Sequence, residues 1–233
     1  MKNGQLITIQ KLVKDYPVGR GYFRALEDIN LTIGEGEFVG LVGPSGSGKT
    51  TLLNIVGSLD VPTKGEAHVL GLSIGTLDAR QSAQLRNRHL GFIFQTYNLL
   101  PVYNVFENVE LPLLLLKIDK EKRREMVDCA LEWVGLQDKR NSRPAQLSGG
   151  ECQRVSIARA MVKSPEIVLA DEPTANLDAE NSHNILQTME NLNRELKTTF
   201  IFATHDDKVI HYLHRKISLL DGKVAKDEQI VKQ

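Results

Sequence analysis

Residues 38–50 read Phe-Val-Gly-Leu-Val-Gly-Pro-Ser-Gly-Ser-Gly-Lys-Thr, and this stretch decides the fold. Its first five residues form an apolar run, as in a buried strand, and the rest fits the pattern G-x-x-x-x-G-K-[ST]. Glycines let the backbone approach an anion closely with its amide groups pointing inward, and a helix that follows aims its positive end at the same anion. We expect that helix to begin in residues 51–56. The stretch therefore predicts a strand, a phosphate-binding loop and a helix.

Four short apolar runs indicate other strands. Residues 6–9 and 29–33 precede the loop, and residues 167–170 and 199–203 follow it. The run at 167–170 is apolar throughout, which is typical of a strand buried on both faces of a parallel sheet. Strands that alternate with helices predict an α/β protein with a parallel sheet at its core.

A mostly helical segment interrupts this alternation between residues 98 and 164. Within it, residues 120–135 are predicted to form a helix that Gly135 ends. After this segment, residues 181–196 are predicted to form another helix. The polar residues from Asp221 onward are expected to form a short tail. The apolar faces expected on the two helices are Met126, Ala130, Trp133 and Val134, and Ile185, Met189, Leu192 and Leu196.

The composition is that of an ordinary globular protein without a strong charge bias. Its 233 residues contain 29 Lys and Arg against 29 Asp and Glu, so no broad basic surface for nucleic acid is expected. No apolar run approaches the roughly 18 residues of a membrane span, and no secretory signal is expected at the start. The two cysteines, Cys129 and Cys152, fit a reducing cytosol and are expected to be small buried or partly buried residues.

Polar residues after two of the predicted strands supply candidate chemistry. In the loop, Lys49 can carry a positive charge to the β- and γ-phosphates, and the Thr50 hydroxyl can ligate Mg²⁺. The run at 167–170 ends in Asp171 and Glu172. Alone, these acids fit a solvated strand end equally well. Beside a phosphate-binding loop, Asp171 is expected to face Mg²⁺, directly or through water, and Glu172 to orient and deprotonate an attacking water.

One further stretch, Leu147-Ser-Gly-Gly-Glu151, resembles the signature sequence of ABC ATPases. Ser148 lies 99 residues after Lys49 (148 − 49) and 23 before Asp171 (171 − 148), a spacing similar to that of transporter cassettes. Other motifs of the family follow in its order: a Q-loop glutamine at Gln95, a D-loop at 176–178, a switch histidine at His205 and an adenine-stacking aromatic at Tyr16.

The resemblance implies an ATPase that binds MgATP and hydrolyses it to ADP and phosphate. Catalytic roles are implied for Glu172, His205, Gln95 and Lys49, and metal ligation for Thr50, Gln95 and Asp171. Adenine stacking is expected at Tyr16, with Tyr22 or Phe23 as competitors. The other nucleotide contacts implied are Gly43, Ser45, Gly46, Ser47, Gly48, Lys49, Thr50, Thr51, Ser148, Gly149, Gly150, Glu151 and Asp178.

The resemblance also implies a P-loop NTPase fold, with a RecA-like parallel-sheet core, an N-terminal antiparallel β subdomain and an inserted α-helical subdomain. The chain is then one ATP-binding cassette, 1–233. Its lobes are a core formed by 1–96 and 165–233 and a helical signature subdomain at 97–164.

The signature also makes sense as a second anion site. Ser148 and two glycines precede a helix predicted at 153–162, and a helix N-terminus attracts phosphate. A chain that already has its own loop needs this site only for another molecule. We therefore expect a symmetric, head-to-tail homodimer that closes on two ATP molecules. The alternative is that Ser148 only caps the helix.

The branch of the family is suggested by residues 91–101, Glu107-Asn-Val109 and Leu111-Pro112, which look like the lipoprotein-release and macrolide-efflux cassettes. In that branch the cassette drives a membrane permease with a large extracytoplasmic domain, which implies a position on the cytoplasmic face of the membrane. Regulatory cassettes of cell-division complexes look similar. A non-transport ABC protein that acts on nucleic acid fits less well, because the 99-residue spacing leaves no room for a long coiled coil. The signature departs from the commoner pattern at Glu151, in place of Gln, and at Cys152.

Overall fold

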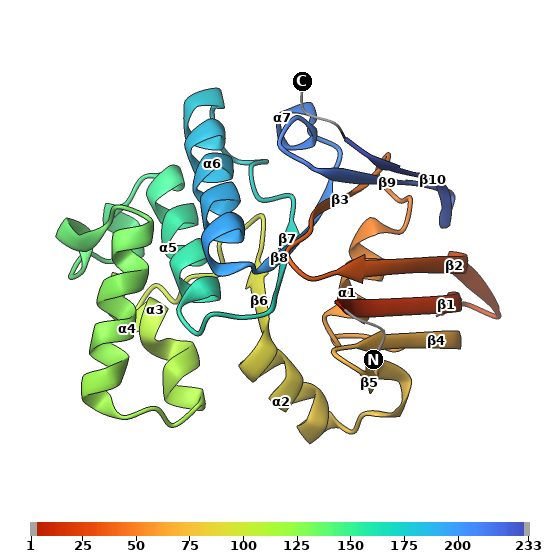
Figure 1. Cartoon of the computed structure of the whole chain (residues 1–233), viewed down its shortest axis with the longest axis horizontal. Coiled ribbons are helices and arrows are strands. Elements are labelled where there is room, and N and C mark those ends of the chain that lie inside the picture. The colour runs from red at the N-terminus through yellow and green to blue at the C-terminus, as the bar shows by residue number, and fades with distance from the viewer. Residues whose placement is uncertain (1–3, 231–233) are drawn as a thin grey trace.

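Two sheets organise residues 4–230, the part of the chain that the computed structural model describes (Figure 1). The larger sheet has the strand order β10-β9-β3-β8-β7-β6. All of its pairings are parallel except β10 with β9. Its strands are β3 (Phe38–Val42), β6 (Leu90–Ile93), β7 (Ile167–Asp171), β8 (Thr199–Thr204), β9 (Arg215–Leu220) and β10 (Lys223–Gln229).

The smaller sheet is antiparallel, with the order β2-β1-β4-β5. Its strands are β1 (Gln5–Val18), β2 (Gly21–Gly34), β4 (Lys64–Val69) and β5 (Leu72–Ser73). The apolar runs predicted at 6–9 and 29–33 are parts of β1 and β2, which pair into one long hairpin with several register shifts. The antiparallel subdomain expected before the loop is therefore present.

The helix α1 (Lys49–Val56) begins directly at the loop and packs between the two sheets. Its buried Leu52 and Ile55 join a hydrophobic cluster with Val39 and Leu41 of β3. Because side chains alternate along a strand, Phe38 of β3 points to the opposite face and joins the cluster under the other helices. The loop is thus fixed between a strand and a helix that are both buried.

Helices cover the second face of the larger sheet and form the left part of Figure 1. Three of them, α3, α4 and α5, pack on one another, and α5 also packs against β6 and α6. The division of the chain into lobes at 97 and 165 stays a prediction. The helices are α2 (Ala79–His89), α3 (Val105–Leu115), α4 (Lys120–Trp133), α5 (Gly149–Met161), α6 (Ala179–Leu196) and α7 (Asp207–Ile210), with short 3-10 turns at Ile74–Thr76, Gln137–Lys139 and Pro144–Gln146.

Several expectations from the sequence differ from the structure. The tail after Asp221 is not irregular, because β10 pairs along β9. The helix predicted at 153–162 begins earlier, at Gly149. Leu196, expected on a buried face, is 37% exposed because it lies at the end of α6, where the sheet no longer covers it. Cys129 is exposed on α4, whereas Cys152 is buried. No helix among residues 4–230 is long and apolar enough to cross a membrane.

Candidate functional site

Parallel pairing brings the polar strand ends together at one edge of the larger sheet. Val42, the last residue of β3, lies opposite Thr204 of β8, and Ala203 lies opposite Asp171 of β7. The carboxyl ends of parallel strands meet at the same edge, so the loop after β3 faces the residues that follow β7 and β8. The sheet therefore assembles the site from segments that are distant in sequence, such as Thr50 and Asp171, which lie 121 residues apart.

The loop is shaped to hold an anion. A Cβ atom on Gly43 would lie 2.2 Å from the carbonyl oxygen of Leu219, so only glycine fits there. Gly48 has a φ of 97° and precedes α1 without a side-chain cap, so the first amide groups of the helix have no capping side chain among residues 4–230. The Ser47 hydroxyl is buried, and no described residue forms a hydrogen bond with it. Lys49 Nζ donates to the carbonyl oxygens of Gly43 and Pro44 at 2.8 and 2.9 Å.

A cavity of about 400 Å³ opens above this loop. It unites most of the residues that the sequence suggested for nucleotide, metal and catalysis. Phe23 and Ala25, near the turn of the β1–β2 hairpin, complete its wall. Its predicted members are Ser45, Gly46, Gly48, Lys49, Thr50, Thr51, Gln95, Asp171, Glu172 and His205.

Asp171 and Thr50 form the pair expected to hold a metal ion. Thr50 Oγ1 donates to the Asp171 carboxylate, with separations of 3.2 and 3.3 Å from its two oxygens. Burial raises the pKa of Asp171 above its ordinary value. Mg²⁺ prefers few protein oxygens together with water and phosphate oxygens, so one carboxylate, one hydroxyl and the nearby Gln95 amide form a fitting donor set.

Glu172 is held in a strained position beside His205. Its φ is 45°, in the left-handed region that residues with a Cβ rarely adopt. Its Oε1 lies 2.5 Å from His205 Nδ1, and its Oε2 accepts a hydrogen bond of 2.9 Å from the Thr204 hydroxyl. Thr204 is the last residue of β8 and His205 follows it. The end of β8, the strand next to β7, therefore fixes the direction of the Glu172 carboxylate.

Two hydrogen bonds that the sequence did not predict tie the site to neighbouring segments. Asn176, in the predicted D-loop, donates through Nδ2 to the Gln95 carbonyl oxygen at 2.9 Å, so it links the segment after Glu172 to the end of β6. The buried Gln153 of α5, which sequence reasoning missed, donates through Nε2 to the Pro173 carbonyl oxygen at 2.6 Å. Both bonds end on backbone carbonyls, and a sequence motif does not reveal such partners.

The signature residues lie outside this cavity. Ser148 is the N-cap of α5 and forms a capping box with Glu151: the Ser148 amide donates to Glu151 Oε2 at 2.8 Å, and the Glu151 amide donates to Ser148 Oγ at 3.2 Å. The hydrogen bond from Ser148 and the nearby Lys139 hold the pKa of Glu151 below its ordinary value. A glutamine could form the same box, so Glu151 differs from the commoner residue chiefly by its charge.

Two glycines follow the cap, and Asp178 lies on a separate helix. A Cβ on Gly150 would lie 2.4 Å from Asn181 Oδ1 of α6, so close contact of α5 with α6 requires glycine here. Asp178 is the N-cap of α6 and accepts from Asn181. Neither Gly149 nor Asp178 lines the cavity of its own chain.

Tyr16 adjoins the cavity without lining it. Its hydroxyl donates to Asp60 Oδ2 at 2.7 Å, and Lys14 Nζ lies 4.8 Å from the centre of its ring. Burial, together with Asp60, raises the pKa of Tyr16. Phe23, its cross-strand neighbour, is 56% exposed and does line the cavity. Two aromatic rings are thus available to stack on an adenine base: that of Tyr16, held by Asp60, and that of the more exposed Phe23.

Comparison with known proteins agrees with this geometry. The fold and the site define an ATP-binding and ATP-hydrolysing cassette. Residues 26–175 match the family described as "ABC transporter", and the chain belongs to that family. The chain is 41% identical over 230 residues to the "Uncharacterized ABC transporter ATP-binding protein MJ0796" of Methanocaldococcus jannaschii, with 97% of each chain covered.

A second relative is a longer protein, and a solved structure of MJ0796 extends the comparison to the fold. It is 44% identical over 225 residues to the "Macrolide export ATP-binding/permease protein MacB" of Rhodopirellula baltica, covering 95% of this chain but only 33% of that protein. Among solved structures, the "Dimeric structure of a post-hydrolysis state of the ATP-binding cassette MJ0796 bound to ADP and Pi" matches with a TM-score of 0.89 and 40% identity, over 97% of this chain and 100% of that chain.

Replacement of Glu172, the predicted general base, should abolish most turnover. A general base contributes about 10²–10⁴ in rate, so Glu172→Gln should reduce ATP hydrolysis by a factor in that range while ATP still binds. Phosphate release from the purified chain measures the rate, and calorimetry measures the affinity. The exposed Glu125→Gln on α4 is the matched control and should hydrolyse ATP at the wild-type rate. Turnover of Glu172→Gln within threefold of wild type would remove Glu172 from the role of base.

The contributions of Tyr16 and Phe23 to binding of the adenine base can be measured separately from phosphate binding. Tyr16→Ala should weaken ATP binding by about 1–3 kcal/mol, the usual value of one base–aromatic stack, and Phe23→Ala should have a smaller effect. Inorganic triphosphate lacks the base, so its affinity should stay unchanged in both variants. If Phe23→Ala carries the loss and Tyr16→Ala does not, the stacking residue is Phe23.

Proposed function

We propose that this chain is the ATP-driven motor of a membrane transporter, which acts as a dimer of cassettes on a membrane permease. The meeting of the loop, the Asp171–Glu172 pair and His205 at one sheet edge carries the proposal, because this set of groups can bind a triphosphate and activate water. The MacB relatives combine an ATP-binding part and a permease in one name, and this chain corresponds to about a third of their length. We infer that a membrane partner supplies the permease here.

Different residues of the cavity have different roles in hydrolysis. The loop amides and Lys49 bind the phosphates, and Lys49 leaves the carbonyl oxygens of Gly43 and Pro44 to reach them. Thr50 and Asp171, assisted by Gln95, are suited to hold Mg²⁺, which neutralises charge on the phosphates.

The residues that activate water lie at the ends of the neighbouring strands β7 and β8. Glu172 takes a proton from the water that attacks the γ-phosphorus in line, and the Thr204 hydroxyl keeps its carboxylate turned toward the cavity. His205, next to Glu172 Oε1, is placed to orient the water and the γ-phosphate. Catalysis then comes mainly from positioning and charge stabilisation.

The signature explains why two copies are needed. Ser148 and the amide groups at the start of α5 form a second anion site, which does not line the cavity of the same chain. In a symmetric dimer each signature would cover the triphosphate bound to the partner's loop. The capping box engages the amide groups of Ser148 and Glu151, so the amides of Gly149 and Gly150 are the ones left for the partner's phosphate. Among relatives, the solved MJ0796 cassette is described as dimeric.

The end of β6 offers a direct path from nucleotide to partner. Gln95 lines the nucleotide cavity, whereas the preceding Phe94 lines a second cavity beside the helical segment. Phe94 and Gln95 are adjacent in the turn that follows β6, so a partner that moves Phe94 also moves Gln95. We propose that the permease docks at this second cavity and that the cassette works at the cytoplasmic face of the membrane. Export or mechanical transmission, as in the MacB branch, is the transport function that this relationship favours.

ATP-dependent dimerisation tests the proposal. Glu172→Gln, which traps bound ATP, should shift from monomer to dimer in MgATP, as measured by light scattering after gel filtration. The double variant Glu172→Gln/Ser148→Arg should stay a monomer, because the arginine fills the space for the partner's phosphate. Without nucleotide, both proteins should be monomers. A monomeric Glu172→Gln protein at saturating MgATP, or a double variant that dimerises equally well, would contradict the head-to-tail arrangement.

A further inference from the structure

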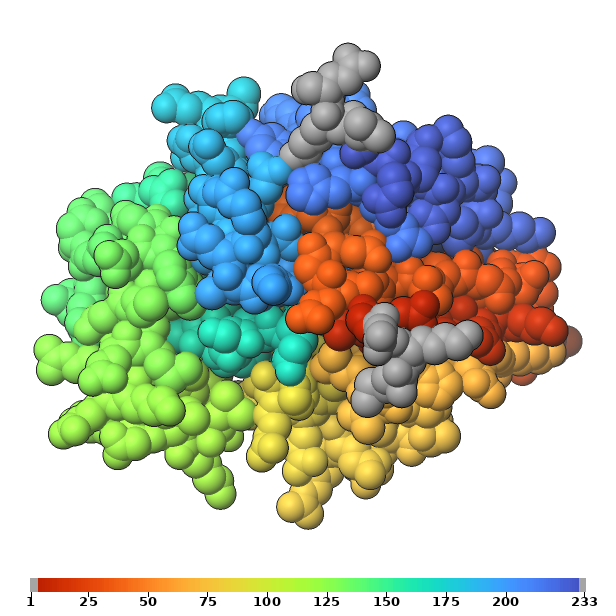
Figure 2. Space-filling view, in the orientation of Figure 1, coloured from red at the N-terminus to blue at the C-terminus, as the bar shows by residue number. Residues whose placement is uncertain are grey.

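The β1–β2 hairpin, which carries Tyr16, lies at the edge of the molecule, at the right of Figures 1 and 2. The phosphate-binding loop belongs to another part of the fold, between β3 and α1. A nucleotide whose base stacks on Tyr16 while its phosphates fill the loop must span both parts. The pairing of β1 with β2 shifts its register twice between Leu12 and Asp15, so the strand ladder alone does not set the distance from the ring to the loop.

A single carboxylate, that of Asp60, holds the Tyr16 side chain. The Tyr16 hydroxyl donates to Asp60 Oδ2 at 2.7 Å. Lys14 Nζ donates to Asp60 Oδ1 at 2.5 Å and to the Val61 carbonyl oxygen at 2.9 Å. Residues two apart on a strand point to the same side, which explains why Lys14 and Tyr16 reach the same carboxylate. The Lys14 ammonium also lies over the Tyr16 ring, 4.8 Å from its centre, so the ring is held both at its hydroxyl and over its face.

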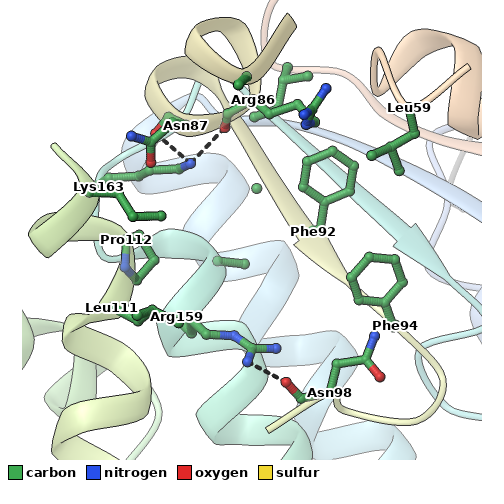
Figure 3. Close-up of a pocket in the computed structure, with 15 residues that line it drawn as sticks. Leu59, Arg86, Asn87, Phe92, Phe94, Asn98, Leu111, Pro112, Arg159 and Lys163 are labelled. Atoms are coloured by element: carbon green, nitrogen blue, oxygen red, sulfur yellow. Dashed lines mark hydrogen bonds between the residues drawn. The ribbon is translucent and has the colours of Figure 1, made fainter. Parts of the chain in front are cut away.

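Asp60 is itself fixed to α1. It lies in the turn after this helix, where the amide groups of Leu59 and Asp60 both donate to the Asn54 carbonyl oxygen, at 2.9 and 3.3 Å. Arg86 of α2 holds the same turn, because its Nη1 donates to the Ser58 carbonyl oxygen at 2.6 Å. Figure 3 shows Arg86 and Leu59 on the wall of the cavity between α2 and α3. Since α1 begins at the phosphate-binding loop, a residue fixed to its far end keeps a set distance from the phosphates.

The charges of this cluster suit its partial burial. Lys14 is only 8% exposed, and Asp60 supplies its counter-charge. Burial alone would raise the pKa of Asp60, but the hydrogen bonds from Lys14 and Tyr16 outweigh it and hold the pKa below its ordinary value. At neutral pH the carboxylate is therefore ionised and accepts both bonds.

A second carboxylate of the hairpin lacks this connection to α1. Asp15 Oδ1 accepts from Arg24 Nε at 2.8 Å, and both residues belong to the hairpin itself. The two side chains can stabilise the pairing of β1 with β2, but they do not fix the hairpin relative to the loop. Asp15 is thus a natural comparison for Asp60.

We propose that Asp60 is a positioning residue for ATP binding, which holds the Tyr16 ring at a set place relative to the phosphate-binding loop. The inference rests on the proposed function, because it takes ATP as the ligand. A ring that is held before the base arrives loses little conformational freedom on binding, so the restraint appears as affinity. Lys14 and Tyr16 engage the two oxygens of Asp60, so its effect on the nucleotide is expected to pass through Tyr16.

Calorimetry on the full chain with ATP and with inorganic triphosphate, which lacks the base, tests this role. Asp60→Ala should weaken ATP binding by a factor of about 3–10, the range expected for one lost hydrogen bond, and leave the affinity for triphosphate unchanged. In a Tyr16→Ala background the ring is already absent, so Asp60→Ala should cause no further loss. Asp60→Asn keeps an acceptor for the Tyr16 hydroxyl and should recover most of the affinity for ATP.

The matched control is Asp15→Ala, which should change neither affinity because its carboxylate has its partner within the hairpin. The inference is overturned if Asp60→Ala binds ATP as tightly as wild type or weakens ATP and triphosphate equally. It is also overturned if Asp60→Ala weakens ATP binding by the same factor with and without the Tyr16 ring.

A conservative variant keeps the inference testable if Asp60→Ala does not fold. Tyr16→Phe retains the ring and deletes only the hydroxyl that Asp60 binds, so it should weaken ATP binding about threefold and leave triphosphate binding unchanged. An affinity for ATP equal to that of wild type would overturn the inference. A wild-type chain that binds neither ATP nor triphosphate would instead contradict the proposed function, so the two failures can be distinguished.

Discussion

Parallel hydrogen bonding among β3, β8 and β7 is the constraint on which the rest of the structure depends. It places Val42 opposite Thr204 and Ala203 opposite Asp171, so the loop, the acid pair and His205 must emerge at one edge. A shift of this register by one residue would turn Phe38, Phe200 and Phe202 away from the core that they share, and this ties the position of the site to the packing of the sheet. Both faces of the sheet are buried, which specifies that register strongly.

The same edge also joins two surfaces with different roles. Gln95 lines the predicted nucleotide cavity, Phe94 lines the second cavity, between α2 and α3, and Asn176 holds the Gln95 carbonyl from the segment that follows Glu172. The link from α5 is equally short, since Gln153 bonds to the Pro173 carbonyl. We therefore expect movements of α5, of the turn after β6 and of the acid pair to be coupled. This connection gives a physical basis for passing work between ATP and a membrane partner, with no long-range pathway required.

Most of the site could be predicted because its functional residues belong to short, contiguous sequence motifs. The loop at 43–50, the acids after β7 and His205 after β8 each follow a recognisable apolar strand, and the structure brings them to one cavity. The elements that escaped prediction lack such a signal. The helix α2 is polar nearly all round, with Leu85 its one buried residue, and β10 is a polar edge strand. Phe23, which the sequence offered only as a competitor of Tyr16, lines the cavity as the cross-strand neighbour of Tyr16 in the β1–β2 hairpin. The positive φ of Glu172 depends on contacts from β8, which local sequence does not encode.

The central claim is that a complete site takes its loop from one chain and its signature from another, and mixing two inactive variants tests it most directly. Lys49→Ala removes the loop cation, and Ser148→Arg blocks the signature, so neither variant alone can form an intact site. In an equimolar mixture, a mixed dimer places the intact loop of the Ser148→Arg chain against the intact signature of the Lys49→Ala chain, which restores one of its two sites. The account predicts that ATP hydrolysis, absent from each variant alone, returns on mixing. A mixture as inactive as its components would contradict it.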